Sequence, residues 1–263
     1  MGSTTSTCGE GNFRPTEASE IARAMARRLG KLLGSVWMLG LGLGAVTIGW
    51  ASRVYFASGE LAPFVIEKLP LPHEAVWLAA LKTHVVAASW ALPACLLLSW
   101  RRALRYPRTH RWLGRVTGVI ILAALVPSGL YLSAYAKGGA PATIGFALSG
   151  LIVALATVWG VRRARARDHL GHRRCMLHVL AQLSVAVTSR TLLPLLDGAG
   201  IDPDPAYLFA LWAPVLAGVG FVEVWLVRRP HRRNSHATKT PARGHVALRP
   251  PVADRPPGVG NAA

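Results

Sequence analysis

Six long apolar segments dominate this chain of 263 residues and constrain its fold more than any other feature. They run at roughly 32–52, 76–100, 114–135, 143–161, 175–196 and 206–227. Each holds about twenty residues, which is the length at which an α-helix crosses the hydrocarbon core of a bilayer. The sequence therefore predicts an all-α fold, a polytopic transmembrane bundle of six helices.

The composition supports this fold class and excludes others. Hydrophobic residues make up 52 % of the chain and charged residues only 16 %, whereas an ordinary soluble domain has roughly 25 % charged residues. This excludes a disordered protein, a coiled coil and a typical cytosolic enzyme. The first apolar segment starts too far from the N-terminus, and is too long, for a signal peptide. The three cysteines form no CxxC pair, so we expect no disulfide framework.

The segments divide the chain into three expected regions. Residues 1–30 are predicted to be a disordered, basic N-terminal segment, and residues 31–228 to form the six-span transmembrane domain. Residues 229–263 are rich in Pro, Arg and His with few bulky apolar residues, which predicts a disordered basic tail.

Basic residues are segregated along the chain, which carries a formal net charge of +18. Of its 30 Lys and Arg residues, 25 lie in the N-terminal part up to Lys31, in the connections between spans two and three and between spans four and five, and in the tail from Arg228 onwards. Positively charged connections stay on the cytoplasmic side of a membrane. We therefore expect a multi-pass protein of the inner (cytoplasmic) membrane with both termini cytoplasmic.

This alternation accounts for the high charge better than nucleic-acid binding does, so no nucleic-acid partner is expected. The expected partners are the lipid bilayer and the anionic lipids of its inner leaflet, which a basic tail would contact. A solvated tail with no role is the alternative.

Ionisable side chains within the spans are candidates for function, because each costs roughly 2.5–3.5 kcal/mol at the centre of a bilayer. His84 of span two and Arg190 of span five lie at similar depths in the outer half. They form a candidate ligand-binding site, in which Arg190 contacts an anion. Alternatively, Lys82 and Arg190 extend their charged groups to the outer interface.

A second group of candidates lies towards the inner side. His110 precedes span three and His172 enters span five, so two helices bring imidazoles to one level. Such a pair can ligate a metal ion or, in a helix bundle, haem iron. The competing interpretation is structural, with Glu223 of span six pairing with Arg173 or His178 to hold the bundle together.

No motif assigns a reaction. The chain has no HExxH, no Gly-rich phosphate loop and no nucleophile elbow. Two functions are predicted as alternatives: a haem- or metal-binding redox protein that uses intramembrane histidines, or a non-catalytic transporter or binding protein with Arg190 as an anion contact. A structural or assembly factor without a small-molecule site is a third.

Several short motifs between residues 84 and 195 resemble one known family. They are His84, the run His110-Arg111-Trp112-Leu113-Gly114-Arg115, Ser128-Gly129, the run His172-Arg173-Arg174-Cys175-Met176, and the run Arg190-Thr191-Leu192-Leu193-Pro194-Leu195. Together they are similar to the uncharacterised bacterial membrane proteins called domain of unknown function 2306. The resemblance implies a membrane helix bundle and no particular activity. In that family an aromatic residue usually stands at position 175 and an arginine at position 178. The histidine pattern is also loosely similar to that of b-type cytochromes and ferric-reductase-like bundles, at the level of fold.

Overall fold

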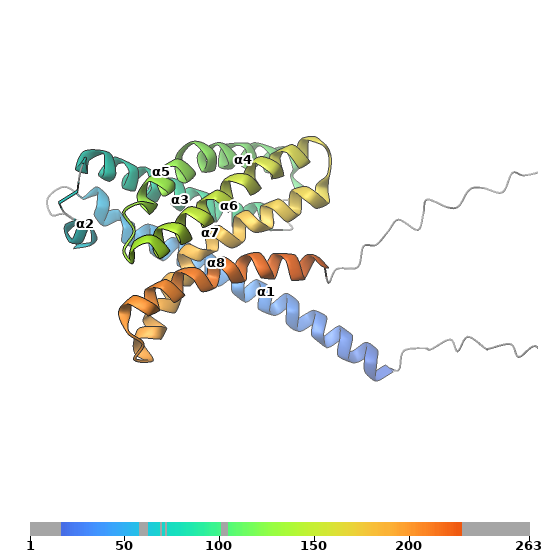
Figure 1. Ribbon diagram of the computed structural model, residues 1–263. Coiled ribbons are helices and arrows are strands. Elements are labelled where there is room, and N and C mark those ends of the chain that lie inside the picture. Colours follow the sequence, from blue (N-terminus) through green and yellow to red (C-terminus); the bar gives the residue numbers. More distant parts are fainter. Residues whose placement is uncertain (1–16, 58–62, 69, 72, 101–104, 228–263) are drawn as a thin grey trace, which may run out of the picture. The chain divides into compact units, whose positions relative to one another are not determined.

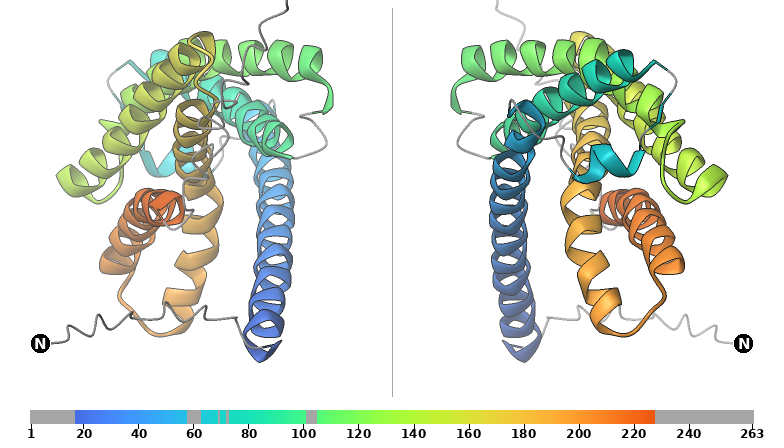
Figure 2. Two further views of the ribbon diagram at one scale, coloured as in Figure 1. Left: turned by 90° about the vertical axis from the view of Figure 1, so that its right-hand side faces the viewer. Right: turned by 90° about the vertical axis from the view of Figure 1, so that its left-hand side faces the viewer.

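The protein is built from helices alone in the part of the chain that the structure describes (Figure 1 and Figure 2). The structure is a computed structural model that describes residues 17–57, 63–68, 70–71, 73–100 and 105–227. Its elements are α1 (Glu17–Ala51), η1 (Ser52–Phe56), α2 (Pro63–Lys68), α3 (Glu74–Ser99), α4 (Pro107–Ile120), η3 (Ile121–Leu125), α5 (Val126–Ser133), α6 (Gly139–Arg165), α7 (His169–Gly198) and α8 (Pro203–Val227).

Six helical stretches of the described residues are long and apolar enough to cross a membrane. They are Ala24–Phe56, Glu74–Ser99, Pro107–Ser133, Gly139–Arg165, His169–Gly198 and Pro203–Val224. The third consists of α4, η3 and α5 in continuous succession. The predicted all-α bundle of six spans is therefore confirmed.

Helix boundaries differ from the predicted ones, mainly at the N-terminal ends. The third span begins at Pro107 and not near 114, because proline suits the first turn of a helix. The fifth begins at His169 and not near 175, because Asp168 caps it. Consequently His110 and His172 lie within helices and have fixed directions. Helix α1 starts at Glu17, before the first span, and most of the two predicted terminal regions, 1–16 and 229–263, lies outside the described residues. The three-region division stays a prediction.

Helix α7 is the centre of the packing. Its Val179 joins a buried cluster with residues of α3, η3, α5 and α6. Its Val185 packs with Ala142 of α6 and Val215 of α8, and its Val187 packs with Leu92 of α3 and with α1. Of all pairs of helices, α6 and α7 make the most extensive contact. Helix α7 is thus packed against α1, α3, α6 and α8, which makes it a rigid support for functional groups.

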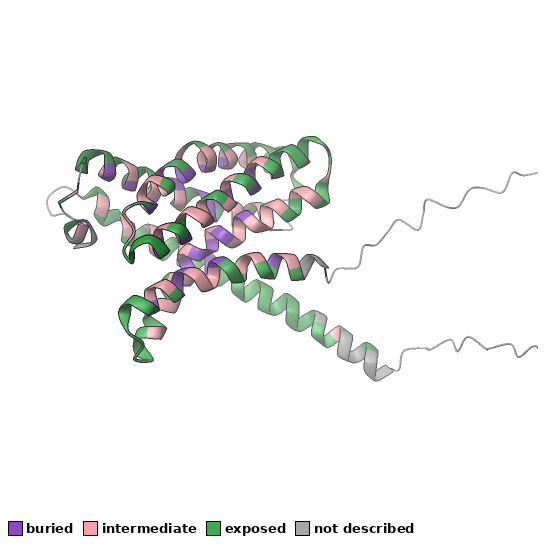
Figure 3. Ribbon diagram, viewed as in Figure 1, coloured by how far each residue is buried: buried purple, intermediate pink, exposed green. Residues whose placement is uncertain are grey.

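Large apolar side chains cover much of the helix surfaces that face outwards. Leu39, Leu195 and Phe221 are each about 70 % exposed, and Figure 3 shows that most of α1 is exposed along its described length. A soluble protein rarely leaves so much apolar surface in contact with water. Lipid chains solvate such surfaces without cost, so the exposure fits helices that lie in a bilayer.

Gly44 provides a test of how α1 packs. A β-carbon at Gly44 would lie 2.3 Å from Cγ1 of Val187 on α7, whereas Gly40 has no neighbouring atom within 4 Å. Because valine is stiff at χ1, Gly44→Ala forces the two helices apart. We expect it to destabilise the protein by about 1–3 kcal/mol, the usual cost of overpacking. Thermal unfolding in detergent measures this. Gly40→Ala is the matched control and is expected to be neutral or slightly stabilising; an equal loss in both variants would contradict this packing.

Candidate functional site

The two ends of the helices differ in charge. We call the end where α6 finishes and α4 and α7 begin the basic end; ten exposed arginines lie there: Arg105, Arg108, Arg111, Arg115, Arg162, Arg163, Arg165, Arg167, Arg173 and Arg174. The opposite end is called the acidic end, because Glu74, Asp197 and Asp204 lie where α3 begins, α7 finishes and α8 begins.

Asp168 fixes the start of α7 at the basic end. Its Oδ1 accepts a hydrogen bond of 2.8 Å from the backbone N–H of Gly171, and its Oδ2 accepts one of 2.7 Å from Arg163. These two donors, the Gly171 N–H first, lower the pKa of the Asp168 carboxyl below its usual value. The carboxylate therefore persists at neutral pH, caps α7 and sets the direction in which the first turns of this helix project their side chains.

His172 points from the second turn of α7 onto α6. Its Nδ1 lies 2.9 Å from the carbonyl oxygen of Gly160. Because a carbonyl only accepts hydrogen bonds, Nδ1 carries the proton and Nε2 of the neutral ring keeps its lone pair. A β-carbon at Gly160 would lie 2.2 Å from Cε of Met176. Glycine at this position thus lets α6 and α7 approach closely and leaves its carbonyl within reach of the imidazole.

His110, on α4, lies near His172. The two imidazoles are close enough to interact electrostatically. Nδ1 of His110 is fully buried and has no hydrogen-bond partner among the described residues. The two histidines that the sequence singled out at this level thus lie at the same end of the bundle, His110 near the start of α4 and His172 near the start of α7. No third His, Cys, Asp or Glu joins them in the described part of the chain to make a larger metal-binding group.

A separate charged cluster joins α7 to α8. Glu223 of α8 accepts hydrogen bonds from Nε of Arg174, at 3.2 Å, and from Arg174 Nη2, and its Oε1 lies 2.8 Å from Nε2 of His178. The sequence predicted Arg173 or His178 as the partner, so His178 is confirmed and Arg174 is an additional partner. His178 faces α8 while His172 faces α6, as their separation of six residues predicts.

His84 contacts the span formed by α4, η3 and α5. Its Nδ1 lies 3.3 Å from the carbonyl oxygen of Leu125 and 3.3 Å from Oγ of Ser128. η3 is a π-helical turn, in which the N–H of Val126 bonds to the carbonyl of Ile121, five residues back. Such turns often occur at functional sites. The Ser128-Gly129 pair lies directly under the imidazole, since a β-carbon at Gly129 would be 2.9 Å from its Cε1.

Arg190 and Lys82 both have exposed side chains. Arg190 Nη1 donates a hydrogen bond of 3.0 Å to the carbonyl of Ala186 in its own helix, and no hydrogen bond joins it to His84 in the described part of the chain. Lys82 lines an open hollow beside Trp90. The exposure of both residues is compatible with extension of their charged groups towards the interface.

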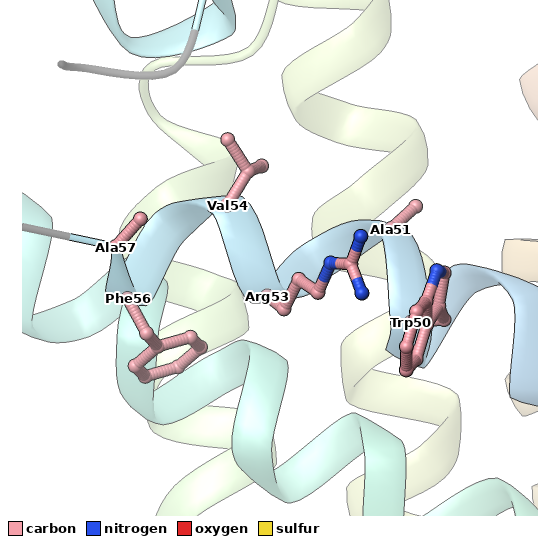
Figure 4. Close-up of a pocket in the computed structure, with 6 residues that line it drawn as sticks. All are labelled: Trp50, Ala51, Arg53, Val54, Phe56 and Ala57. Atoms are coloured by element: carbon pink, nitrogen blue, oxygen red, sulfur yellow. The ribbon is translucent and has the colours of Figure 1, made fainter.

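A second open hollow lies at the end of α1 (Figure 4). There the guanidinium of Arg53 lies 3.8 Å from the ring centre of Trp50, a cation–π contact. Aromatic and cationic side chains gather where a span meets the membrane interface. Arg53 is the one ionisable side chain among the described residues that line this hollow, and its contact with Trp50 is typical of an interfacial anchor.

Sequence reasoning missed a buried polar link in the middle of the bundle. Gln182 of α7 is 3 % exposed; its Oε1 accepts from Ser149 of α6 at 2.9 Å, and its Nε2 donates to the carbonyl of Val215 on α8 at 3.1 Å. A glutamine within an apolar segment was the available signal, because buried amides in membranes need partners.

Six apolar helical spans with ionisable groups at their interfaces define a polytopic, all-helical membrane protein. The family model described as predicted membrane protein, DUF2306, matches residues 81–226, more than half of the chain. The chain belongs to this family, as the motifs predicted. No curated protein and no solved structure matches it significantly.

Proposed function

We propose that this protein binds a metal centre, either haem iron or a bare transition-metal ion, through His110 and His172 at the basic end of the bundle, and that it serves redox or metal handling in the membrane. The observation that carries the proposal is the hydrogen bond from His172 Nδ1 to the Gly160 carbonyl. A metal-ligating histidine usually donates its second ring N–H to a carbonyl or carboxylate, which fixes the tautomer and presents the other nitrogen to the metal.

The environment of His110 supports a ligand at the same place. A fully buried ring nitrogen without a hydrogen-bond partner costs free energy, so an unpaired Nδ1 calls for an explanation. A metal bound between His110 and His172 would give each ring a partner for a nitrogen that has none among the described residues. Two neutral imidazoles from different helices are a usual ligand set for haem iron in a helix bundle, and imidazole also suits copper and zinc.

His84 does not belong to this centre. Its contact, Leu125, lies fifteen residues after His110 along the same span, which is about 22 Å at the helical rise. The proposed centre therefore consists of His110 and His172 without His84, and any ligand at His84 occupies a second place.

The experiment that tests the proposal is a titration of the full-length protein, purified in detergent, in two separate arms. Haemin is expected to give a shifted, saturable Soret band if the centre is haem, and Cu²⁺ to give nitrogen hyperfine structure in its electron paramagnetic resonance spectrum if it is a bare ion. Either signal is expected to be lost in His110→Ala and in His172→Ala. His169→Ala is the matched control, because His169 is exposed at the first position of the same helix. The proposal would be overturned if neither haemin nor Cu²⁺ gave its signal, or if the signals were unchanged in both histidine variants.

The proposal also includes the membrane and the orientation of the protein in it. We place the protein in the inner membrane with the basic end and both termini in the cytoplasm, since arginine-rich connections are retained on that side. The exposed arginines of the basic end would then contact anionic lipids of the inner leaflet.

A further inference from the structure

His84 presents an unused hydrogen-bond acceptor near the acidic end. Ser128 has a single hydroxyl proton, and its Oγ lies 2.6 Å from the carbonyl of Ala124 and 3.2 Å from that of Leu125. That proton goes to one of the two carbonyls, so both atoms near Nδ1 of His84, the Leu125 carbonyl and Ser128 Oγ, are acceptors for it. Nδ1 therefore carries the proton of the neutral ring, and Nε2 keeps a lone pair that no described residue engages.

The His84 ring is held in one orientation. It rests on Gly129, where a β-carbon would lie 2.9 Å from Cε1 and 3.2 Å from Nδ1. With Nδ1 tied to α5 and η3 and one face against Gly129, the ring cannot turn to exchange its two nitrogens without losing these contacts. The acceptor Nε2 is thus fixed in place, which is the arrangement that a binding site requires.

Arg190 provides a cation at the same depth. Helices α3 and α7 run in opposite directions, and Leu92 of α3 packs in one cluster with Leu183 and Val187 of α7. His84 precedes Leu92 by eight residues on α3, and Thr191 follows Leu183 by eight residues on α7. Each step is about 12 Å along its helix, and the two steps lead towards the same end of the bundle. In this register His84 of α3 and Arg190 of α7 lie at similar depths.

The guanidinium of Arg190 has unused donors and no acidic partner. It donates one hydrogen bond to the backbone of its own helix and forms no ion pair within the described residues. An arginine offers five N–H donors in a planar fork that suits phosphate oxygens. A cation in a span without a counter-charge is costly, so an anion bound here would be stabilised.

We propose that His84 and Arg190 form a second binding site, specific for a singly charged phosphate group that keeps a P–OH, as in the monoanion of a phosphomonoester or in dihydrogen phosphate. Such a group carries a P–OH that donates to His84 Nε2 and a P–O⁻ that accepts from Arg190. A carboxylate or a phosphodiester has the negative charge but lacks the acidic hydroxyl, so it leaves Nε2 unpaired. The one negative charge matches the one guanidinium. The phosphate comes either from the headgroup of a lipid such as phosphatidic acid or from free inorganic phosphate.

Thermal unfolding of the full-length protein in detergent tests this proposal, because a ligand that binds the folded state raises the midpoint. Phosphatidic acid, inorganic phosphate and phosphatidylglycerol are added separately. We expect a saturable rise of a few degrees with one or both of the first two and none with phosphatidylglycerol, a phosphodiester. A rise with phosphatidic acid alone assigns the site to a lipid headgroup, and a rise with inorganic phosphate assigns it to the free ion.

Three variants locate the effect. His84→Ala and Arg190→Leu are expected to abolish the rise, and Arg190→Lys to keep part of it, which also covers the case in which Arg190→Leu does not fold. Arg53→Leu is the matched control, since Arg53 is another exposed arginine at the end of a span, in contact with Trp50. The rise is expected to persist in His110→Ala, which separates this site from the proposed metal centre. An equal rise with phosphatidylglycerol, a rise that survives in His84→Ala, or no rise with any probe would overturn the proposal.

Discussion

Glu223→Ala is expected to lower the free energy of unfolding by about 1–2 kcal/mol. Glu223 is the common acceptor for Arg174 and His178 and ties α7 to α8. Removing it leaves a guanidinium and an imidazole unpaired at the edge of a span. Loss of one partner of a buried ion pair costs about 3–5 kcal/mol, but the side chains of Glu223 and Arg174 are both more than a third exposed, and screening reduces the expected cost to about 1–2 kcal/mol.

The measurement is unfolding in detergent, followed by circular dichroism. Glu223→Gln keeps the volume and one acceptor oxygen, so an intermediate loss is expected. Asp197→Ala removes an exposed carboxylate from the far end of α7 and is expected to be neutral. Arg174→Ala in the Glu223→Ala background should cost less than Arg174→Ala alone, because the pair is already broken. A stability unchanged by Glu223→Ala would show that this cluster does not hold α7 to α8.

The number of spans and their helical structure could be predicted from the sequence. A segment that crosses a bilayer must pair all its backbone polar groups within a helix, and it needs about twenty apolar residues to do so. The starts of α4 and α7 could not be predicted from hydropathy. Arg108, Arg111 and Arg173 are polar, yet they extend their helices because Pro107 and Asp168 begin them. Helix-start signals carry this information and hydropathy does not.

The choice of partners for the site residues needed the three-dimensional structure. Arg173 and Arg174 are equally plausible partners of Glu223 in the sequence, but they differ by about 100° around the helix, and only the position of α8 selects Arg174. The sequence also could not predict that His84 contacts the carbonyl of Leu125 or that His172 contacts the carbonyl of Gly160. Every residue has a backbone carbonyl, so the residue type does not indicate which one accepts a hydrogen bond. The Ser128-Gly129 motif was visible, but the reason for it, contact with His84, was not.

The orientation of the spans is the second prediction with a large effect, because a reporter fused to a membrane protein is active on one side only. The basic end holds the ten arginines named above, while Glu74, Asp197, Asp202 and Asp204 lie at the acidic end. Both ends of the domain and its two arginine-rich connections are therefore predicted to stay in the cytoplasm. In this orientation the proposed metal centre faces the cytoplasm, and the proposed His84–Arg190 site faces the opposite side.

Alkaline phosphatase, which is active only after export, tests this orientation most directly when fused at two places. One fusion follows Ile201, between α7 and α8, and the other follows Arg228, just beyond α8. We predict an active enzyme after Ile201 and an inactive one after Arg228. Activity after Arg228 with none after Ile201 would contradict the account, since it would reverse the bundle and place the two histidine sites on the wrong sides of the membrane.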